Sequence, residues 1–183
     1  MWITRTWNKK IRRFVKSIQY IKGTFFYALE SITCHFMKHA MKPKKAADQA
    51  ILQVEAYSDS QFFLFLNLGY LGVVGRKYGE NSQQYSDAIV DNDMQTARLV
   101  DALKSLGIYD ETLVMITIDH GFTENGYDHG TSAPDTLDLW LATNFDLSAD
   151  FFYQQDIAPT IYDLFGVDWS AFQPTLIGDS LVA

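Results

Sequence analysis

The chain has 183 residues, which suits one domain, and its composition of 48% apolar and 20% charged residues is typical of a globular protein. A single cysteine, Cys34, excludes a disulfide framework within the chain. Residues 1–46 carry eleven Lys/Arg and one acid (net +10), whereas the remainder carries four Lys/Arg and 21 acids (net −17). The acidic body argues against nucleic-acid binding and is compatible with a cation site.

Residues 1–46 differ from the rest of the chain in charge and in pattern. Apolar residues recur there at steps of three and four between Ile11 and Phe36, the spacing of one helix face. We therefore predict a basic amphipathic helical extension over 1–46, packed on a partial α/β domain over 47–183. The alternative is that this helix lies on an anionic membrane surface.

The first half of the predicted domain alternates between helical and strand patterns. After a break around Pro43, a short helix is predicted with Ala47, Ala50 and Val54 on one face. A buried strand follows at 62–66, and a glycine-rich stretch over 69–79 is predicted to be a flexible loop. The clearest helix covers 82–106, with Ser82 as its N-cap and Gly107 at its end.

The second half begins with an apolar, β-branched run at 112–118 that predicts a strand buried on both faces. A shorter strand is expected over 137–143 and a helix over 154–165, with Pro159 near its first turn. This order of strands and helices predicts an α/β fold with a largely parallel sheet flanked by helices.

Asp119 and His120 stand side by side where the strand 112–118 ends. Ligands of open α/β sheets bind outside the carboxyl ends of the strands, and Asp oxygen and His nitrogen are both good ligands for Zn²⁺-like ions. His129 follows nine residues later as a third candidate ligand. The alternative is that Asp119 only caps local structure, as Asp often does.

Several motifs, taken in order, resemble the type I phosphodiesterase/nucleotide pyrophosphatase family, which belongs to the alkaline phosphatase superfamily together with sulfatases and phosphoethanolamine transferases. The resemblance covers about residues 47–183 and suggests the C-terminal half of such an enzyme. Its motifs are Phe62–Asn67, Gly75-Arg76-Lys77-Tyr78-Gly79, Ser82–Tyr85, Gly107–Val114, Asp119-His120-Gly121, His129-Gly130, Gln155–Thr160 and Gly178–Leu181.

The resemblance implies a partial alkaline-phosphatase-like domain with a two-metal site, in which a Ser or Thr hydroxyl on one metal attacks phosphorus or sulfur. It implies that Asp119 and His120 ligate the metal that activates the nucleophile, and that His129 ligates the second metal or touches the substrate. The divalent metal is expected to be Zn²⁺, with Mn²⁺, Mg²⁺ or Ca²⁺ as alternatives.

Two departures from the family pattern reduce the expected catalytic equipment. No nucleophile is identified, because the family's nucleophile lies in an N-terminal half to which residues 1–46 offer no match. In the glycine-rich stretch, the family's Asp position holds Gly72 and its His position holds Arg76. Glycine has no ligating side chain and Arg⁺ repels a metal ion, although Arg76 would suit a phosphate group of the substrate.

Three functions follow as alternatives. The first is a metal-dependent phosphodiesterase, pyrophosphatase or sulfuryl hydrolase that acts on a small phosphate or sulfate ester. The second is a non-catalytic fragment or pseudoenzyme, and the third is a membrane-surface interaction protein that uses residues 1–46. A partial sheet also exposes its edges, which predicts self-association and low stability.

Overall fold

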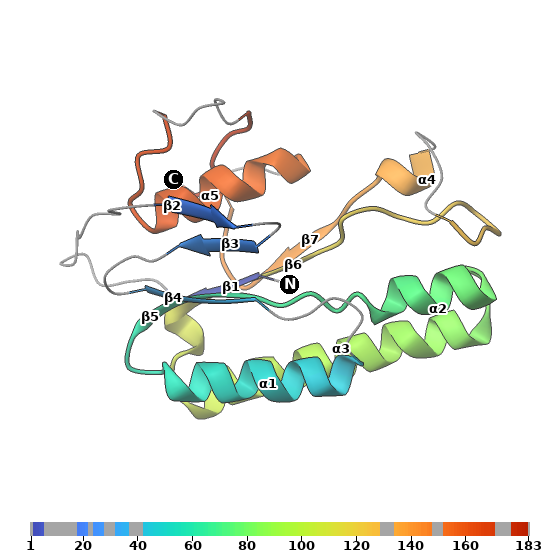
Figure 1. The fold of residues 1–183 in the computed structure, drawn as a ribbon, viewed down its shortest axis with the longest axis horizontal. Coiled ribbons are helices and arrows are strands. Elements are labelled where there is room, and N and C mark those ends of the chain that lie inside the picture. The colour runs from blue at the N-terminus through green and yellow to red at the C-terminus, as the bar shows by residue number, and fades with distance from the viewer. Residues whose placement is uncertain are drawn as a thin grey trace.

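The computed structural model describes the backbone of residues 2–5, 18–21, 24–27 and 32–36, and residues 42–128, 134–147, 152–170 and 177–182 in full. Helices α1 (Pro43–Ala56) and α3 (Gln83–Ser105) cover one face of a sheet, and α5 (Ile157–Leu164) lies on the other face (Figure 1). Helix α2 (Tyr70–Tyr78) runs beside α3 beyond the end of the sheet. The shorter helices are η1 (Tyr109–Glu111), α4 (Pro134–Leu137) and η2 (Gln154–Asp156).

The main sheet has five described strands in the order β4 (Ile32–Phe36), β5 (Gln61–Phe65), β1 (Trp2–Arg5), β6 (Thr112–Thr117) and β7 (Leu141–Thr143). Strands β2 (Ile18–Ile21) and β3 (Thr24–Tyr27) form a separate antiparallel pair. Mixed helix and strand content agrees with the prediction, but the largely parallel sheet does not. Among the described pairings of the main sheet, β4–β5 alone is parallel. The prediction failed because it did not include β1, which lies between β5 and β6 and runs antiparallel to both.

Strands β5 and β6 nevertheless point the same way, because both are antiparallel to β1. Their carboxyl ends therefore lie at the same edge of the sheet. The chain that leaves β5 enters α2, and the chain that leaves β6 enters the stretch around Asp119 and His120. This shared direction brings α2 to the predicted site.

The helix predicted between Ile11 and Phe36 is wrong where the structure describes this stretch. Residues 18–21, 24–27 and 32–36 are strands, and β4 pairs with β5 in the main sheet. Steps of three and four in a basic sequence do not exclude strands, because pairing with a neighbouring strand overrides local periodicity. The basic residues between 9 and 16, on which the membrane-surface alternative depends, lie outside the described residues. No helix among the described residues is both long and apolar enough to span a bilayer.

Two other local predictions are corrected. The expected break around Pro43 is the start of α1, with Pro43 in the first turn, where its missing N–H costs no hydrogen bond. The expected glycine loop over 69–79 is helix α2, and only Gly79 among its glycines has a positive φ, of 87°. Gly72 and Gly75 have helical backbone conformations, and Gly75 is packed against the Phe122 ring of the predicted site.

Of the remaining elements, the strand predicted over 137–143 is shorter than expected, because Leu137 ends α4 and β7 begins at Leu141, whereas the others agree with their predictions. Helix α3 begins after Ser82, whose hydroxyl accepts a hydrogen bond from the Tyr85 backbone N–H at 3.2 Å, and Gly107 follows its end with a φ of 70°. Strand β6 and helix α5 also lie where the apolar patterns placed them. Gly166 follows α5 with a φ of 65°.

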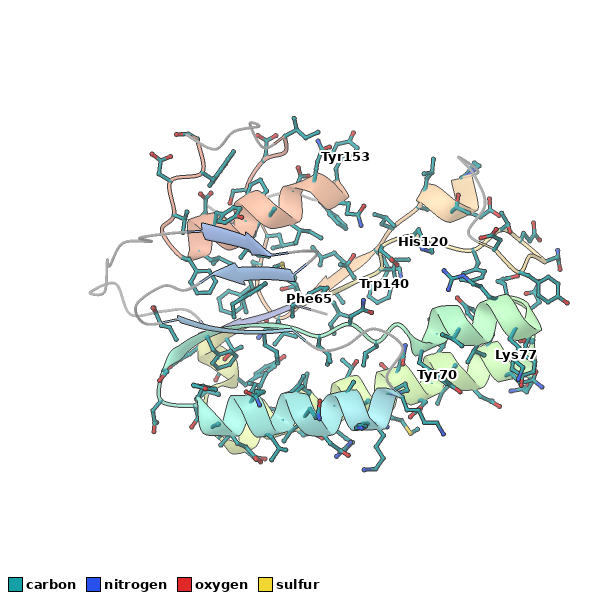
Figure 2. All side chains as sticks on the ribbon, viewed as in Figure 1. Phe65, Tyr70, Lys77, His120, Trp140 and Tyr153 are labelled. Carbon is teal, nitrogen blue, oxygen red and sulfur yellow. The ribbon has the colours of Figure 1, made fainter. Side chains whose placement is uncertain are left out.

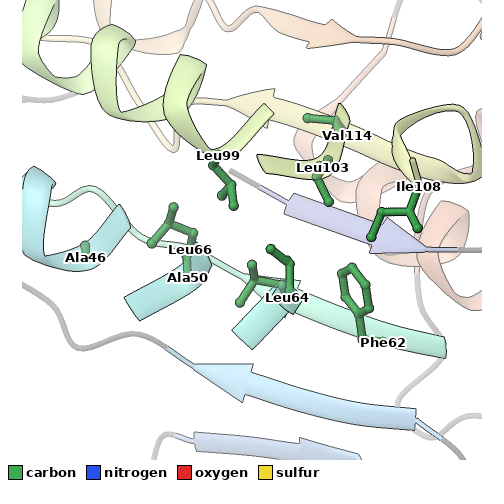
Figure 3. Close-up of a cluster of buried hydrophobic side chains, with 10 residues drawn as sticks. Ala46, Ala50, Phe62, Leu64, Leu66, Leu99, Leu103, Ile108 and Val114 are labelled. Atoms are coloured by element: carbon green, nitrogen blue, oxygen red, sulfur yellow. The ribbon is translucent and has the colours of Figure 1, made fainter. Parts of the chain in front are cut away.

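Strand β6 is buried on both faces, as its continuous apolar run predicts. Val114 belongs to a cluster between the sheet and helices α1 and α3 (Figure 3), whereas Leu113 and Met115 pack against Ile157 of α5. The first cluster contains Ala46, Ala50, Val54, Phe62, Leu64, Leu66, Leu99, Leu103, Ile108 and Val114. This two-sided core holds the end of β6, and hence the predicted site, in place.

A charged contact joins α1 to α3 and makes stability depend on pH. The Asp48 carboxylate accepts hydrogen bonds from Lys44 at 2.8 Å and Arg98 at 2.6 Å, which lower the pKa of Asp48 below its usual 3.8. The depressed pKa in the folded state stabilises the fold above pH 3.8, and this contribution is lost as the pH falls through the folded-state value. We expect the urea midpoints of wild type and Asp48→Asn to differ at pH 7 and to converge below pH 3.8. A constant difference across the titration would contradict this.

Candidate functional site

The structure places Asp119 and His120 immediately after β6, at the carboxyl edge of the sheet. The Asp119 side chain is 82% exposed and the His120 side chain 33% exposed. His120 Nε2 lies 3.7 Å from Asp119 Oδ2, and the His120 backbone N–H donates to Asp119 Oδ1 at 3.2 Å. Figure 2 shows His120 between the start of β7 and helix α2. The two predicted ligands therefore converge.

The contact of the other imidazole nitrogen, Nδ1, determines which nitrogen of the His120 ring carries the proton. Nδ1 lies 2.9 Å from the carbonyl oxygen of Gly121, and a carbonyl oxygen only accepts hydrogen bonds. In the neutral ring Nδ1 therefore carries the proton and Nε2, which lies 3.7 Å from Asp119 Oδ2, carries the lone pair. A zinc ion binds imidazole nitrogen at about 2.0–2.1 Å and carboxylate oxygen at about 2.0–2.2 Å. Two such bonds span more than the 3.7 Å between Nε2 and Oδ2, so one ion is able to contact both atoms.

Residues 119–128, here called the site loop, are attached to α4 and η2 on one side. The Gly121 N–H donates to the Thr136 carbonyl at 3.1 Å, and the Glu124 N–H donates to Asp135 Oδ2 at 2.9 Å. Gln154 of η2 donates through Nε2 to the Asp119 carbonyl at 3.3 Å. A Cβ on Gly121 would overlap the Asp135 carbonyl oxygen, so only glycine allows this approach.

The other side of the site loop packs against α2 and the start of α3. A Cβ on Gly75 would lie 2.7 Å from the Phe122 ring, and the Phe122 and Tyr85 ring centroids are 5.5 Å apart. A Cβ on Gly79 would meet the Tyr127 ring at 3.3 Å. Gly75 in α2 and Gly79 just after it thus leave room for the aromatic side chains of the site loop. Burial raises the pKa of the Tyr85 hydroxyl, and the negative charge of Glu80 adds to this shift.

Gly72 and Arg76 lie one helical turn apart on α2. Arg76 Nη1 donates to the Gly72 carbonyl at 3.3 Å, and a Cβ on Gly72 would meet Nη1 at 3.2 Å. Arg76 is exposed and belongs to the last turn of α2. The Arg76 guanidinium therefore folds back over its own helix, beside the position that would otherwise hold the side chain of residue 72.

The third predicted ligand, His129, lies outside the described residues. The turn before it is closed by Thr123, whose N–H and hydroxyl both donate to the Asp128 carbonyl, at 3.1 and 2.8 Å. Among the residues that the structure describes, no three His, Cys, Asp or Glu side chains gather at metal-binding distances. The described part of the site thus contains two of the three candidate ligands.

Sequence reasoning missed the residues that hold the site loop. Glu80 Oε2 accepts from the Asn125 backbone N–H at 3.0 Å, and Asn81 Nδ2 donates to Asn125 Oδ1 at 2.7 Å. Asn125 has a φ of 55°, which asparagine tolerates better than most residues. These partners are 44 and 45 positions apart in the chain, so no local pattern indicates them.

The family model of the type I phosphodiesterase / nucleotide pyrophosphatase family matches residues 3–153. The chain belongs to this family. A search of curated proteins found no match to the chain. The family prediction is therefore confirmed, but the extent of the match differs from the expected range of about 47–183. In this phosphodiesterase-family chain the match begins within β1 and ends just before η2.

Two motifs quoted for the resemblance lie beyond the matched range, and the structure connects them. Asp156 accepts from the Tyr153 N–H at 2.7 Å and from the Asp179 N–H at 2.9 Å. Thr160, which is fully buried, donates to the Asp156 carbonyl at 2.6 Å and accepts from the Leu181 N–H at 2.9 Å. In the described residues these two motifs attach the last segment of the phosphodiesterase-family chain to α5.

Proposed function

We propose that this chain carries the cation-binding part of a phosphodiesterase/pyrophosphatase-like hydrolase site. In this proposal Asp119, His120 and His129 hold a divalent cation, Zn²⁺ first, with Mn²⁺, Mg²⁺ or Ca²⁺ as alternatives. The observation that carries the proposal is the 3.7 Å separation of Asp119 Oδ2 and His120 Nε2 at the carboxyl edge of the sheet. Family membership supports the same assignment.

The protein's own residues contribute orientation and charge to this site. The Gly121 carbonyl fixes the proton of His120 on Nδ1, so Nε2 is the nitrogen that carries the lone pair needed by a metal ion. Gln154 restrains the backbone of Asp119 through its carbonyl. A divalent cation, when bound, would polarise a phosphoryl oxygen and lower the pKa of a coordinated hydroxyl or water.

We further propose that the chain does not catalyse ester hydrolysis by itself, because no residue of it is assigned as the nucleophile. Two further ligand positions of the family pattern hold Gly72 and Arg76, and Arg76 lies back on its own helix. This observation favours a pseudoenzyme as the second candidate function. In either case Arg76 is proposed to contact the phosphate of a small ester, because its planar guanidinium suits bidentate binding of phosphate oxygens.

The proposal extends to two further properties of the chain. A sulfatase or phosphoethanolamine-transferase activity would use the same ligand types, and self-association would occur through a sheet edge, where β4 and β7 flank the described strands. Assays with a sulfate ester and a phosphodiester separate sulfatase activity from phosphodiester hydrolysis.

The test is the metal content of the purified chain after loading with Zn²⁺ and dialysis, compared with Asp119→Ala and His120→Ala. We expect each substitution to weaken retention about tenfold or more, because each removes one of few ligands. Asp101→Ala, which removes an exposed acid of α3, serves as the matched control and should retain metal as the wild type does. Equal metal content in all four proteins would contradict the proposal.

Hydrolysis assays complete the test. With Zn²⁺ or Mn²⁺ present, we expect wild type and Asp119→Ala to hydrolyse bis(p-nitrophenyl) phosphate and p-nitrophenyl sulfate equally slowly. Metal-dependent turnover of the phosphodiester that is lost in Asp119→Ala would show a complete catalyst and remove the pseudoenzyme alternative. Turnover of the sulfate alone would favour the sulfatase-like alternative.

A further inference from the structure

The connection between α2 and α3 makes a set of contacts with the site loop that the proposed metal site does not use. The Glu80 backbone N–H donates to the Gly126 carbonyl at 3.0 Å, and Glu80 Oε2 accepts from the Asn125 N–H at 3.0 Å. Residue 80 therefore contacts the site loop through both its backbone and its side chain. Asn81 adds a third bond, to the Asn125 side chain, at 2.7 Å.

Gly79 and Ser82, on either side of Glu80 and Asn81, set the position of Glu80. Gly79 turns the chain out of α2 with a φ of 87°, and its missing side chain leaves space for the Tyr127 ring. Ser82 then caps α3 and donates through its hydroxyl to the Gly79 carbonyl at 2.7 Å. This short, hydrogen-bonded turn holds Glu80 half-buried at the edge of the site loop.

The contact continues to the two candidate ligands. Phe122 packs between Gly75 and Tyr85, and its ring centroid is 6.4 Å from that of His120. In the chain, Phe122 comes two residues after His120 and three residues before Asn125, whose backbone N–H binds Glu80. A carboxylate that accepts a backbone N–H makes a charge-assisted bond, which is about twice as strong as a neutral one.

We propose that Glu80 is a positioning residue for the Asp119–His120 pair, acting by holding the Asn125 turn of the site loop against α2 and α3. This inference rests on the proposed function, in which the pair binds a divalent cation. It adds a specific residue, outside the ligand set, whose hydrogen bond sets the geometry of the ligands.

The variants for the test are Glu80→Ala, which removes the acceptor, and Glu80→Gln, which keeps an acceptor oxygen without the charge. Asp87→Ala is the matched control, because Asp87 is an exposed acid of the same helical hairpin and accepts a hydrogen bond from Gln83, within α3. Two quantities are measured on the full chain. They are the amide hydrogen exchange of residues 121–126 and the affinity for Co²⁺, followed by its visible absorption.

In Glu80→Ala we expect exchange over residues 121–126 to accelerate about tenfold and Co²⁺ affinity to fall about tenfold, the range found when groups behind metal ligands are removed. Glu80→Gln should recover most of both losses, and Asp87→Ala should change neither. A merely structural role would instead accelerate exchange in α1 and α3 as well, and that result would overturn the proposal.

Failure of this inference and failure of the proposed function give different results. If the wild type binds Co²⁺ and Glu80→Ala binds it equally well, Glu80 is not a positioning residue. If the wild type binds no Co²⁺ but Glu80→Ala still accelerates exchange at residues 121–126 alone, the metal function fails and the role of Glu80 in holding the loop stands. Equal exchange in Glu80→Ala and Glu80→Gln, both fast, would overturn the hydrogen-bond explanation.

Discussion

Gly121→Ala is expected to lower the free energy of unfolding by about 1–3 kcal/mol, the usual range for overpacking a close contact. A Cβ at this position would overlap the Asp135 carbonyl oxygen and lie 3.1 Å from the Asp135 carbonyl carbon. Both atoms are backbone, so they cannot move aside as the end of a flexible side chain can. The segment at α4 must shift, which breaks the 3.1 Å bond from the Gly121 N–H to the Thr136 carbonyl.

The same substitution is expected to weaken metal binding, because Gly121 follows His120 directly and its carbonyl orients the His120 ring. Gly72→Ala is the matched control, since its Cβ would meet only the end of the Arg76 side chain. Alanine in the interior of α2 should raise stability by about 0.5–1 kcal/mol. Urea denaturation and Zn²⁺ retention of both variants measure these effects. A Gly121→Ala protein as stable as the wild type would contradict the close approach.

The double substitution Gly72→Asp with Arg76→His is expected to give the chain about one additional bound Zn²⁺ ion. Residues four apart on a helix lie on one face, a spacing that suits two ligands of one metal. The two substitutions also replace a repulsive positive charge with a carboxylate and a neutral imidazole. The helix can accept them, because the space beside Gly72 is limited only by the Arg76 guanidinium that is removed.

The single variants are the controls for this experiment. In Gly72→Asp the new carboxylate is expected to pair with Arg76 and to bind no metal, and Arg76→His offers a single ligand. Metal stoichiometry by plasma emission after dialysis distinguishes the three proteins, and circular dichroism confirms that each keeps its helices. A folded double variant with the metal content of the wild type would show that this face of α2 is not a ligand position of the site.

Elements with a strong local signal were predicted well. The Ser82 cap, the span of α3 and the continuous apolar run of β6 depend on residues a few positions apart, so the sequence is enough to predict them. The glycines over 69–79 were misread because glycine permits turns and also permits close packing. The position of Phe122 against Gly75, which only the structure shows, indicates that Gly75 serves close packing.

The residues of the candidate site also divide into those with a local sequence signal and those that depend on long-range contacts. Asp119 and His120 were identifiable because they end a buried strand, where the chemistry of α/β sheets takes place. Glu80 and Asn125 were not, because their bond joins two loops that come together only after both strands are in the sheet.

The amino-acid sequence by itself determined the family, most of the central helices and strands, and the pair of candidate ligands, since these are recorded in residue types and short spacings. The tertiary structure alone decided strand direction, the helical state of residues 70–78 and the residues that hold the site loop. The physical reason is that strand pairing and loop contacts depend on partners tens of residues away, whose approach costs chain entropy that no local pattern expresses.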